Sequence, residues 1–133
     1  MEIKNKLFSQ ELFGRNSELP NQKPIEIQFH LLGDEITSIQ WRNKLQLHQI
    51  NVIKAAILAC SNYTIPCFVE DTKYPSEIIA AELVSTRLLY DDNNQITNIW
   101  GYFQTKDVIN NKIIKFIVLI DNETNDIDIS LNK

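Results

Sequence analysis

Short, largely apolar segments separated by polar turns repeat through the C-terminal half of the sequence and restrict it to few folds. Three segments have the length of strands and are rich in isoleucine, valine and aromatic residues: Ile96–Thr105, Ile113–Ile120 and Ile127–Leu131. The turns before and between them are rich in Asp and Asn: Asp91–Gln95, Lys106–Lys112 and Asp121–Asp126. Together with a strand that ends before Asp91, this spacing predicts an antiparallel meander of four strands. Its member at 113–120 is apolar on both faces except at Lys115, so it should lie in the middle of the sheet.

A hairpin is expected near the N-terminus. Apolar residues alternate with polar ones over 25–31 and again over Glu35–Trp41, and the pair Gly33-Asp34 between the two runs is typical of a tight turn. Residues 2–13 carry a weaker helical pattern, which predicts a short N-terminal helix followed by a polar loop.

A long helix is expected after the hairpin. Apolar residues recur at helical spacing over Lys44–Asn62, and Asn43 is the expected cap. Residues 52–60 of this segment are apolar almost all round. We therefore expect this helix to be buried on more than one side and to lie across the concave face of the sheet.

The segment between this helix and the meander is the least regular part of the sequence. Pro66 within Tyr63–Asp71 predicts an edge strand or an extended segment, because proline cannot donate a hydrogen bond to a neighbouring strand. Over residues 76–90 the helix and strand signals compete, and we expect a helical turn to about Ala81 followed by a strand.

These elements together predict a single α+β domain over residues 1–133. Its mostly antiparallel sheet, made of the N-terminal hairpin and the C-terminal meander, would pack against one long central helix, with a short N-terminal helix beside it. With 133 residues and 44% apolar content, the chain can bury a core without disulfides or metal. The sequence has no signal-peptide pattern, and its longest apolar runs fall far short of the ~20 residues that span a membrane, which predicts a cytoplasmic protein.

The chain is acidic, with a formal net charge of −4 and a sequence pI near 5.1. Affinity for nucleic acids comes largely from Lys and Arg, which displace the counterions of the phosphate backbone. We therefore expect no nucleic-acid partner and no membrane partner. The acidic balance instead favours a basic protein as the partner.

The acidic residues of the meander are expected to gather at one end of the sheet. Turns of a meander alternate between its two ends, so the turns at 91–95 and 121–126 should emerge together. Five carboxylates would share this end: Asp91, Asp92, Asp121, Glu123 and Asp126. Asp128 on the last strand would extend the negative strip. Such a surface speeds association with a basic protein and rejects acidic ones.

Three interpretations of these carboxylates remain open. Asp and Asn are common in hairpin turns because they bond their own backbone, and acids also protect an edge strand from pairing with other chains. A basic protein partner is the second interpretation. A cation site is the third, although the loop lacks the glycine and the flanking helices of an EF-hand.

Trp100 and Tyr102 form the second candidate surface. They share one face of the strand at 96–105, and aromatic side chains with polar atoms are enriched at protein interfaces. They either pack in the core against the long helix or, if Ile99 and Phe103 face the core instead, become exposed and available for contact. The sequence does not choose between the two faces.

No catalytic residue, metal site or cofactor is expected. His48 and Cys60 would lie about 18 Å apart on one helix, beyond hydrogen-bond reach, and Cys60 is expected to be a small core residue. Nothing in the spacing brings Cys67 and His30 together, and the two cysteines should remain thiols. The ligand pairs of a zinc site and the glycine-rich loop of a nucleotide site are both missing from the sequence.

The sequence thus favours a small acidic, non-catalytic binding protein that neutralises or escorts a basic protein. Inhibitors, bacterial toxin-immunity proteins and secretion chaperones are of this kind, and a toxin or a nuclease is the candidate partner. The protein would act as a monomer or a homodimer, using the six carboxylates with Trp100 and Tyr102. One alternative is an enzyme or ligand-binding domain whose pocket lies between sheet and helix, with Glu70, Asp71 or Glu82 as acid or base. Another is a homo-oligomer assembled through a sheet edge.

Overall fold

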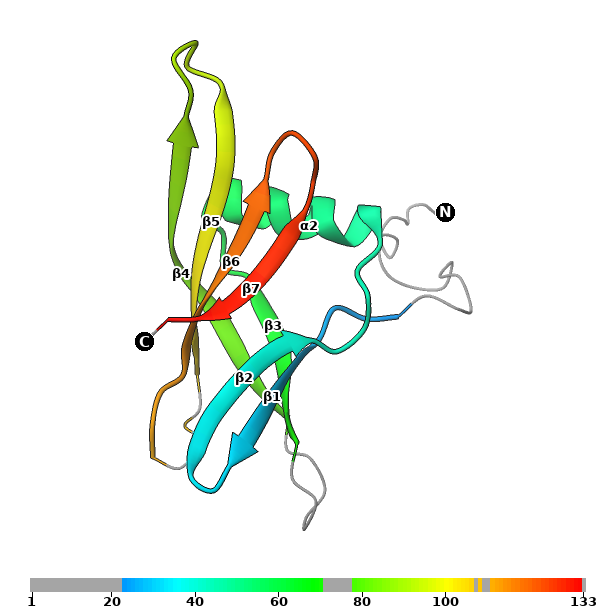
Figure 1. Cartoon of the computed structure of the whole chain (residues 1–133), viewed down its shortest axis with the longest axis vertical. Helices are drawn as coiled ribbons and strands as arrows, with labels where there is room; N and C mark the ends of the chain where they lie inside the picture. The colour runs from blue at the N-terminus through cyan, green and yellow to red at the C-terminus, as the bar shows by residue number, and fades with distance from the viewer. Residues whose placement is uncertain (1–22, 71–77, 107, 109–110, 133) are drawn as a thin grey trace, which may run out of the picture.

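The computed structural model describes residues 23–70, 78–106, 108 and 111–132. The described elements follow in the order β1 (Ile27–Leu32), β2 (Glu35–Trp41), α2 (Leu47–Ala59), β3 (Thr64–Glu70), β4 (Ile78–Tyr90), β5 (Ile96–Thr105), β6 (Lys115–Asp121) and β7 (Ile127–Leu131) (Figure 1). The expected N-terminal helix at residues 2–13 lies outside the described residues. The N-terminal hairpin and the three C-terminal strands are confirmed, with β2, β5 and β7 at the predicted bounds.

The overall architecture differs from the predicted one. All seven strands form one sheet in the order β2-β1-β3-β4-β5-β6-β7, and the sheet curls until its outer strands, β2 and β7, lie near each other (Figure 1). The result is a nearly closed barrel. The prediction of an α+β sheet packed against one long central helix is therefore wrong. The reason is that the strands fill the interior with their own inward side chains, and α2 covers only part of it.

Helix α2 is shorter and less buried than expected. It has 13 residues and begins after Gln46, whose backbone N–H donates to Gln49 Oε1 at 2.8 Å, so Asn43 is not the cap. Its buried residues, Gln49, Ile53 and Ile57, form a single stripe. The apolar side chains on its other faces are about half exposed: Leu47 (59%), Val52 (49%) and Leu58 (45%). The prediction that this helix is buried on more than one side is wrong.

The middle of the chain also departs from expectation. β3 lies inside the sheet, parallel to β1 and antiparallel to β4, so the prediction of an edge strand is wrong. The ladder with β1 begins at Cys67, one residue after Pro66, so the missing N–H of the proline costs no hydrogen bond there. β4 is extended from Ile78, which excludes the predicted helical turn at 78–81. Its inward residues Ile79 and Ala81 are buried in the core.

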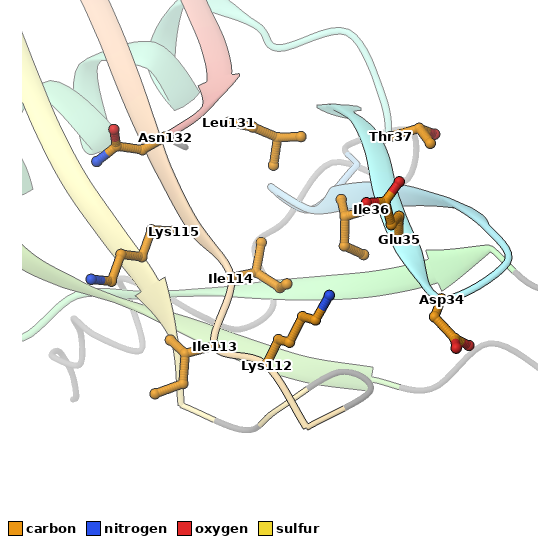
Figure 2. Close-up of a pocket in the computed structure, with 10 residues that line it drawn as sticks. All are labelled: Asp34, Glu35, Ile36, Thr37, Lys112, Ile113, Ile114, Lys115, Leu131 and Asn132. Carbon is orange, nitrogen blue, oxygen red and sulfur yellow. The ribbon is translucent and has the colours of Figure 1, made fainter.

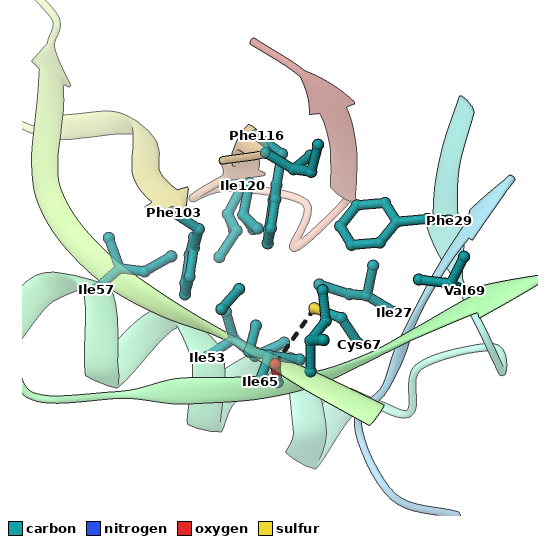
Figure 3. Close-up of a cluster of buried hydrophobic side chains, with 14 of the residues drawn as sticks. Ile27, Phe29, Ile53, Ile57, Ile65, Cys67, Val69, Phe103, Phe116 and Ile120 are labelled. Carbon is teal, nitrogen blue, oxygen red and sulfur yellow. Dashed lines mark hydrogen bonds between the residues drawn. The ribbon is translucent and has the colours of Figure 1, made fainter. Parts of the chain in front are cut away.

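The core is made mainly of isoleucine and phenylalanine from both walls of the barrel (Figure 3). The rings of Phe103 and Phe116 stack with centroids 5.3 Å apart, and Phe29 meets Phe116 edge-on at 6.2 Å. These contacts join β1 to β5 and β6 across the interior. They therefore hold the curled sheet together where no backbone ladder connects its outer strands.

The contact between α2 and the sheet is tight at Gly101 of β5. A Cβ placed on this residue would lie 2.7 Å from Cδ1 and 2.8 Å from Cγ1 of Ile57. Both distances are below ordinary van der Waals contact. The missing side chain of Gly101 is therefore what allows the buried stripe of α2 to reach the sheet.

Candidate functional site

The turn between β4 and β5 is built around Asp91. Its Oδ1 accepts hydrogen bonds from the backbone N–H groups of Asn93 at 2.8 Å and Gln95 at 3.0 Å. Asn94 lies in the left-handed region, with φ of 62°, which asparagine tolerates better than most residues. One oxygen of Asp91 thus serves the turn itself.

The turn between β6 and β7 repeats this arrangement around Asp121. The N–H groups of Thr124 and Glu123 donate to Asp121 Oδ1 at 3.1 and 2.9 Å. Because these donors favour the charged form, they lower the pKa of the Asp121 carboxyl below its usual value. Asp121 therefore stays ionised to a lower pH than an ordinary aspartate does.

The structure places the two turns side by side at one end of the sheet, uppermost in Figure 1. The backbone N–H of Asn122 donates to Thr97 O, and its side-chain Nδ2 donates to Ile96 O, both at 2.9 Å. A groove of about 390 Å³ between the turns has both Asp91 and Asp121 in its walls. The alternation of turns along the meander therefore gave their relative position correctly.

The remaining carboxylates point into solvent. Asp92, Glu123 and Asp126 are exposed, as is Asp128 on β7. Ion pairs between described residues join His30 to Glu70 and Arg42 to Glu26, and none involves these four side chains. We use the name acidic end for Asp91, Asp92, Asp121, Glu123 and Asp126. Their role in partner binding stays a prediction.

One cation belongs to this region, and the sequence pattern did not reveal it. Lys54 of α2 donates from Nζ to Asn125 Oδ1 at 2.7 Å and to Asn122 Oδ1 at 3.2 Å. Lys54 lies in the segment Lys44–Asn62, which the sequence predicts to be a helix. Its charge within the otherwise apolar stretch 52–59 is the available signal, but the turn that it contacts lies about 70 residues away.

The structure decides which face of β5 is buried. Ile99, Gly101 and Phe103 face the core, so Trp100 and Tyr102 lie on the outer side of the sheet, half-buried. This is the second of the two arrangements considered from the sequence. Arg87 of β4 places its guanidinium 5.4 Å from the centre of the Trp100 ring, on the same outer side. Sequence reasoning missed Arg87.

A second groove lies along the seam between the outer strands β2 and β7 (Figure 2). Its volume is about 400 Å³. One wall is the start of β2, with Glu35 and Ile36, and the other contains Lys112, Ile114 and Leu131 (Figure 2). The groove opens where β7 ends, and its walls carry acidic groups on one side and basic groups on the other.

The carboxylates considered for an enzyme do not converge. Glu70 is exposed at the end of β3, and its side chain contacts His30. Glu82 of β4 lies opposite Thr64, which is at the start of β3. The start and the end of β3 are six residues of extended chain apart, so Glu70 and Glu82 are separated by about 20 Å. Asp71 lies outside the described residues. Between α2 and the sheet, the space is filled by the side chains of Ile53 and Ile57, which are fully buried.

The Cys67 thiol is unsuited to nucleophilic chemistry. Burial raises the pKa of the Cys67 thiol to about 12. Its Sγ donates a hydrogen bond to Ile65 O inside the core (Figure 3). His30, which the sequence analysis considered as a possible neighbour of this thiol, lies on the outer side of the sheet against Glu70. Cys60 is exposed at the end of α2 with φ of 48°, so its prediction as a core residue is wrong. Both cysteines are free thiols.

Two further findings bear on the candidate chemistry. Within the described residues, no three His, Cys, Asp or Glu side chains are grouped as a metal site would require. No described helix is both long enough and apolar enough to cross a bilayer.

Neither the protein-family models, nor the curated proteins, nor the solved structures contain a match to this chain. The function must therefore be argued from its own residues.

Proposed function

We propose that this chain is a small acidic binding protein that neutralises or escorts a basic protein, and that the acidic end is the surface it presents. The observation that supports the proposal is the meeting of two acidic turns at one end of the sheet, with three carboxylates directed into solvent. A basic toxin or nuclease, whose substrate channel attracts phosphate groups, is the kind of partner that fits this charge.

Not every carboxylate of the acidic end has the same weight in this proposal. Asp91 and Asp121 are explained in part by their turns, because each binds two backbone N–H groups. Asp92, Glu123 and Asp126 make no such double contact. They can be changed without removing the hydrogen bonds that shape the two turns, so they carry the test.

The test begins with affinity capture from extracts of the source cells, using the full chain as bait. A retained basic protein is then purified, and its association rate is measured with the neutralising variant Asp92→Asn/Glu123→Gln/Asp126→Asn. We expect the rate to fall roughly tenfold at low salt and the difference to shrink as salt is added, because steering by exposed charges is screened. The dissociation rate should change less.

A control with the same change in net charge separates the acidic end from the charge of the whole molecule. Glu35→Gln/Ser38→Lys/Gln40→Lys alters three exposed positions on β2 and also raises the net charge by three. This control is expected to associate nearly as fast as the wild type. Equal losses in both variants, or retention of acidic proteins alone, would remove the proposal.

A further inference from the structure

The outer side of α2 is exposed and largely apolar. Seven exposed residues make up this side: Leu47, His48, Asn51, Val52, Ala55, Leu58 and Ala59. At about 100° per residue they fall within an arc of about 140° around the helix axis. Five of the seven are apolar, and the three largest of these are 45–59% exposed. α2 therefore carries apolar side chains on two sides, whereas its buried stripe is only Gln49, Ile53 and Ile57.

The size of this surface limits what can cover it. Burial of a whole Leu or Val side chain removes on the order of 100 Å² of apolar surface from water. The two alanines are smaller, and Leu47, Val52 and Leu58 are already about half-covered. The outer side of α2 thus offers much less than the roughly 800 Å² that each partner buries in a stable protein complex. A segment tethered nearby needs less area, because a short linker gives it an effective concentration on the order of millimolar.

The described chain begins beside this helix. The backbone oxygen of Lys23 accepts a hydrogen bond from the side chain of Gln49, which lies in the first turn of α2 together with Leu47. The 22 residues that precede Lys23 in the sequence are therefore attached at the N-terminal end of α2.

The sequence of these 22 residues consists of an apolar part and a polar part. Besides Met1, residues 1–13 contain five large apolar side chains: Ile3, Leu7, Phe8, Leu12 and Phe13. Residues 14–22, GRNSELPNQ, contain only Leu19. Apolar side chains gain free energy when they leave water, so residues 1–13 have the composition of a segment that binds an apolar surface.

The length of the polar part agrees with the distance to be covered. α2 has 13 residues, which at 1.5 Å per residue make it about 20 Å long. The nine residues 14–22 span about 30 Å when fully extended. From their attachment at Lys23, residues 1–13 can therefore reach every part of the outer side of α2.

We propose that residues 1–13 of the same chain bind the outer side of α2 and cover Leu47, Val52 and Leu58. While they are bound, this apolar surface is closed to other proteins. The proposal goes beyond the binding of a basic protein and does not rest on it, because none of the residues of the acidic end belongs to α2.

Cys60 provides a probe for this contact. It is the C-cap of α2 and is exposed, whereas Cys67 is buried, so a nitroxide reagent reacts at Cys60 of the full chain. In the labelled chain, the amide NMR signals of residues 3–13 should lose more than half of their intensity. The control Cys60→Ser/Ser38→Cys carries the label at an exposed position of β2, away from α2 (Figure 1), and should leave these signals nearly unchanged.

A change on the helix tests which surface is bound. Val52→Asp/Leu58→Asp places two charges among the apolar side chains, at exposed positions where the fold tolerates them. With the label on Cys60, the signals of residues 3–13 should recover to the level of the Ser38 control. Leu32→Asp/Ile113→Asp makes the same change at exposed apolar residues outside α2 and should leave the loss of intensity as in the wild type. Circular dichroism melting curves establish that both variants remain folded.

A mixed sample separates contact within one chain from contact between two. Spin-labelled chain without isotopes is mixed with isotope-labelled chain that carries no nitroxide, and no signal should weaken. Weakening of the signals of residues 47–59 in the mixture would assign the outer side to a second copy and overturn the proposal. Full intensity of residues 3–13 in the labelled wild type, or a loss that persists in Val52→Asp/Leu58→Asp, would overturn it as well.

Discussion

At the scale of single residues, each acidic turn contains carboxylates of two kinds. Asp91 and Asp121 direct one oxygen at two backbone N–H groups and so fix the shape of their turns. Asp92, Glu123 and Asp126 face solvent. The interpretation as ordinary hairpin chemistry therefore accounts for the first kind, and the proposed steering of a basic partner uses mainly the second.

Asp121 predicts a specific loss of stability in acid. Its pKa is lowered in the folded chain by the N–H groups of Thr124 and Glu123, while an unfolded Asp titrates near ~3.9. Its stabilising contribution is present above that value and is lost as the pH falls through the folded pKa. Urea denaturation from about pH 6 to about pH 2 should show a larger loss for the wild type than for Asp121→Asn, which keeps an acceptor oxygen but cannot ionise.

The control for this experiment is Asp92→Asn, which removes one negative charge from the same end but none of the hydrogen bonds to Asp121. It reports the general effect of weaker repulsion among the carboxylates. Parallel curves for the wild type and Asp121→Asn would contradict the role assigned to the charged form of Asp121.

Gly101 predicts a second effect of a single residue. In Gly101→Ala the new methyl group meets the fully buried side chain of Ile57, which must move. Overpacking of this kind lowers the free energy of unfolding by about 1–3 kcal/mol. The urea midpoint should fall accordingly, provided that the slope of the transition is unchanged.

A double-mutant cycle tests whether Ile57 is the cause. Ile57→Ala alone leaves a cavity and should cost about 2–5 kcal/mol. In the Gly101→Ala background it should cost clearly less, because it removes the atoms that the new methyl group meets. Strictly additive losses would show that the destabilisation of Gly101→Ala arises elsewhere.

At the scale of elements, Lys54 connects the helix to the turn between β6 and β7. Its ammonium group reaches the side-chain oxygens of Asn122 and Asn125, and Asn125 has φ of 64°. The helix therefore contributes to the acidic end through a hydrogen-bonded cation as well as to the core through its apolar stripe.

Lys54→Met tests this connection, because methionine keeps most of the aliphatic length and lacks the charge. We expect a loss of about 1 kcal/mol in the free energy of unfolding, since hydrogen bonds from charged donors are worth more than neutral ones. Hydrogen exchange should quicken at the amides of 123–126 more than at those of β6. Lys44→Met, at an exposed position before α2, is the matched control. An equal increase in hydrogen exchange along the whole chain would contradict a local effect of Lys54 on this turn.

The elements differ in how far the sequence could predict them. Alternation fixed β2, β5 and β7 because each has one inward and one outward face. The same reasoning gave a wrong prediction for α2. Its apolar residues suggested that the helix is buried all round, but the side chains on its outer side are exposed. The outward position of Arg87 depends on an irregularity near Val84, which shifts the register of β4 against β5 by one residue. A shift of one residue exchanges the two faces of a strand, and no local pattern announces it.

At the scale of the whole molecule, the sequence predicted several strands correctly but not the nearly closed barrel that they form. The relative position of the acidic turns followed from chain reversal alone, so the sequence was enough to place Asp91 beside Asp121. Closure of the sheet depends instead on the parallel pairing of β1 with β3, which are separated by α2. That pairing joins residues 40 positions apart, such as His30 and Glu70, and local periodicity carries no information about it.

The position of β1 beside β3 also bears on how the chain is assembled during synthesis. The hairpin β1–β2 is translated before its only further neighbour in the sheet, and β7, which faces β2 across the seam, is translated last of all the strands. Long-range pairings of this kind are slow to form. The ribosome must therefore deliver the chain through β7 before β1 and β2 can reach their final surroundings, and until then the apolar side of the hairpin has nothing permanent to cover it.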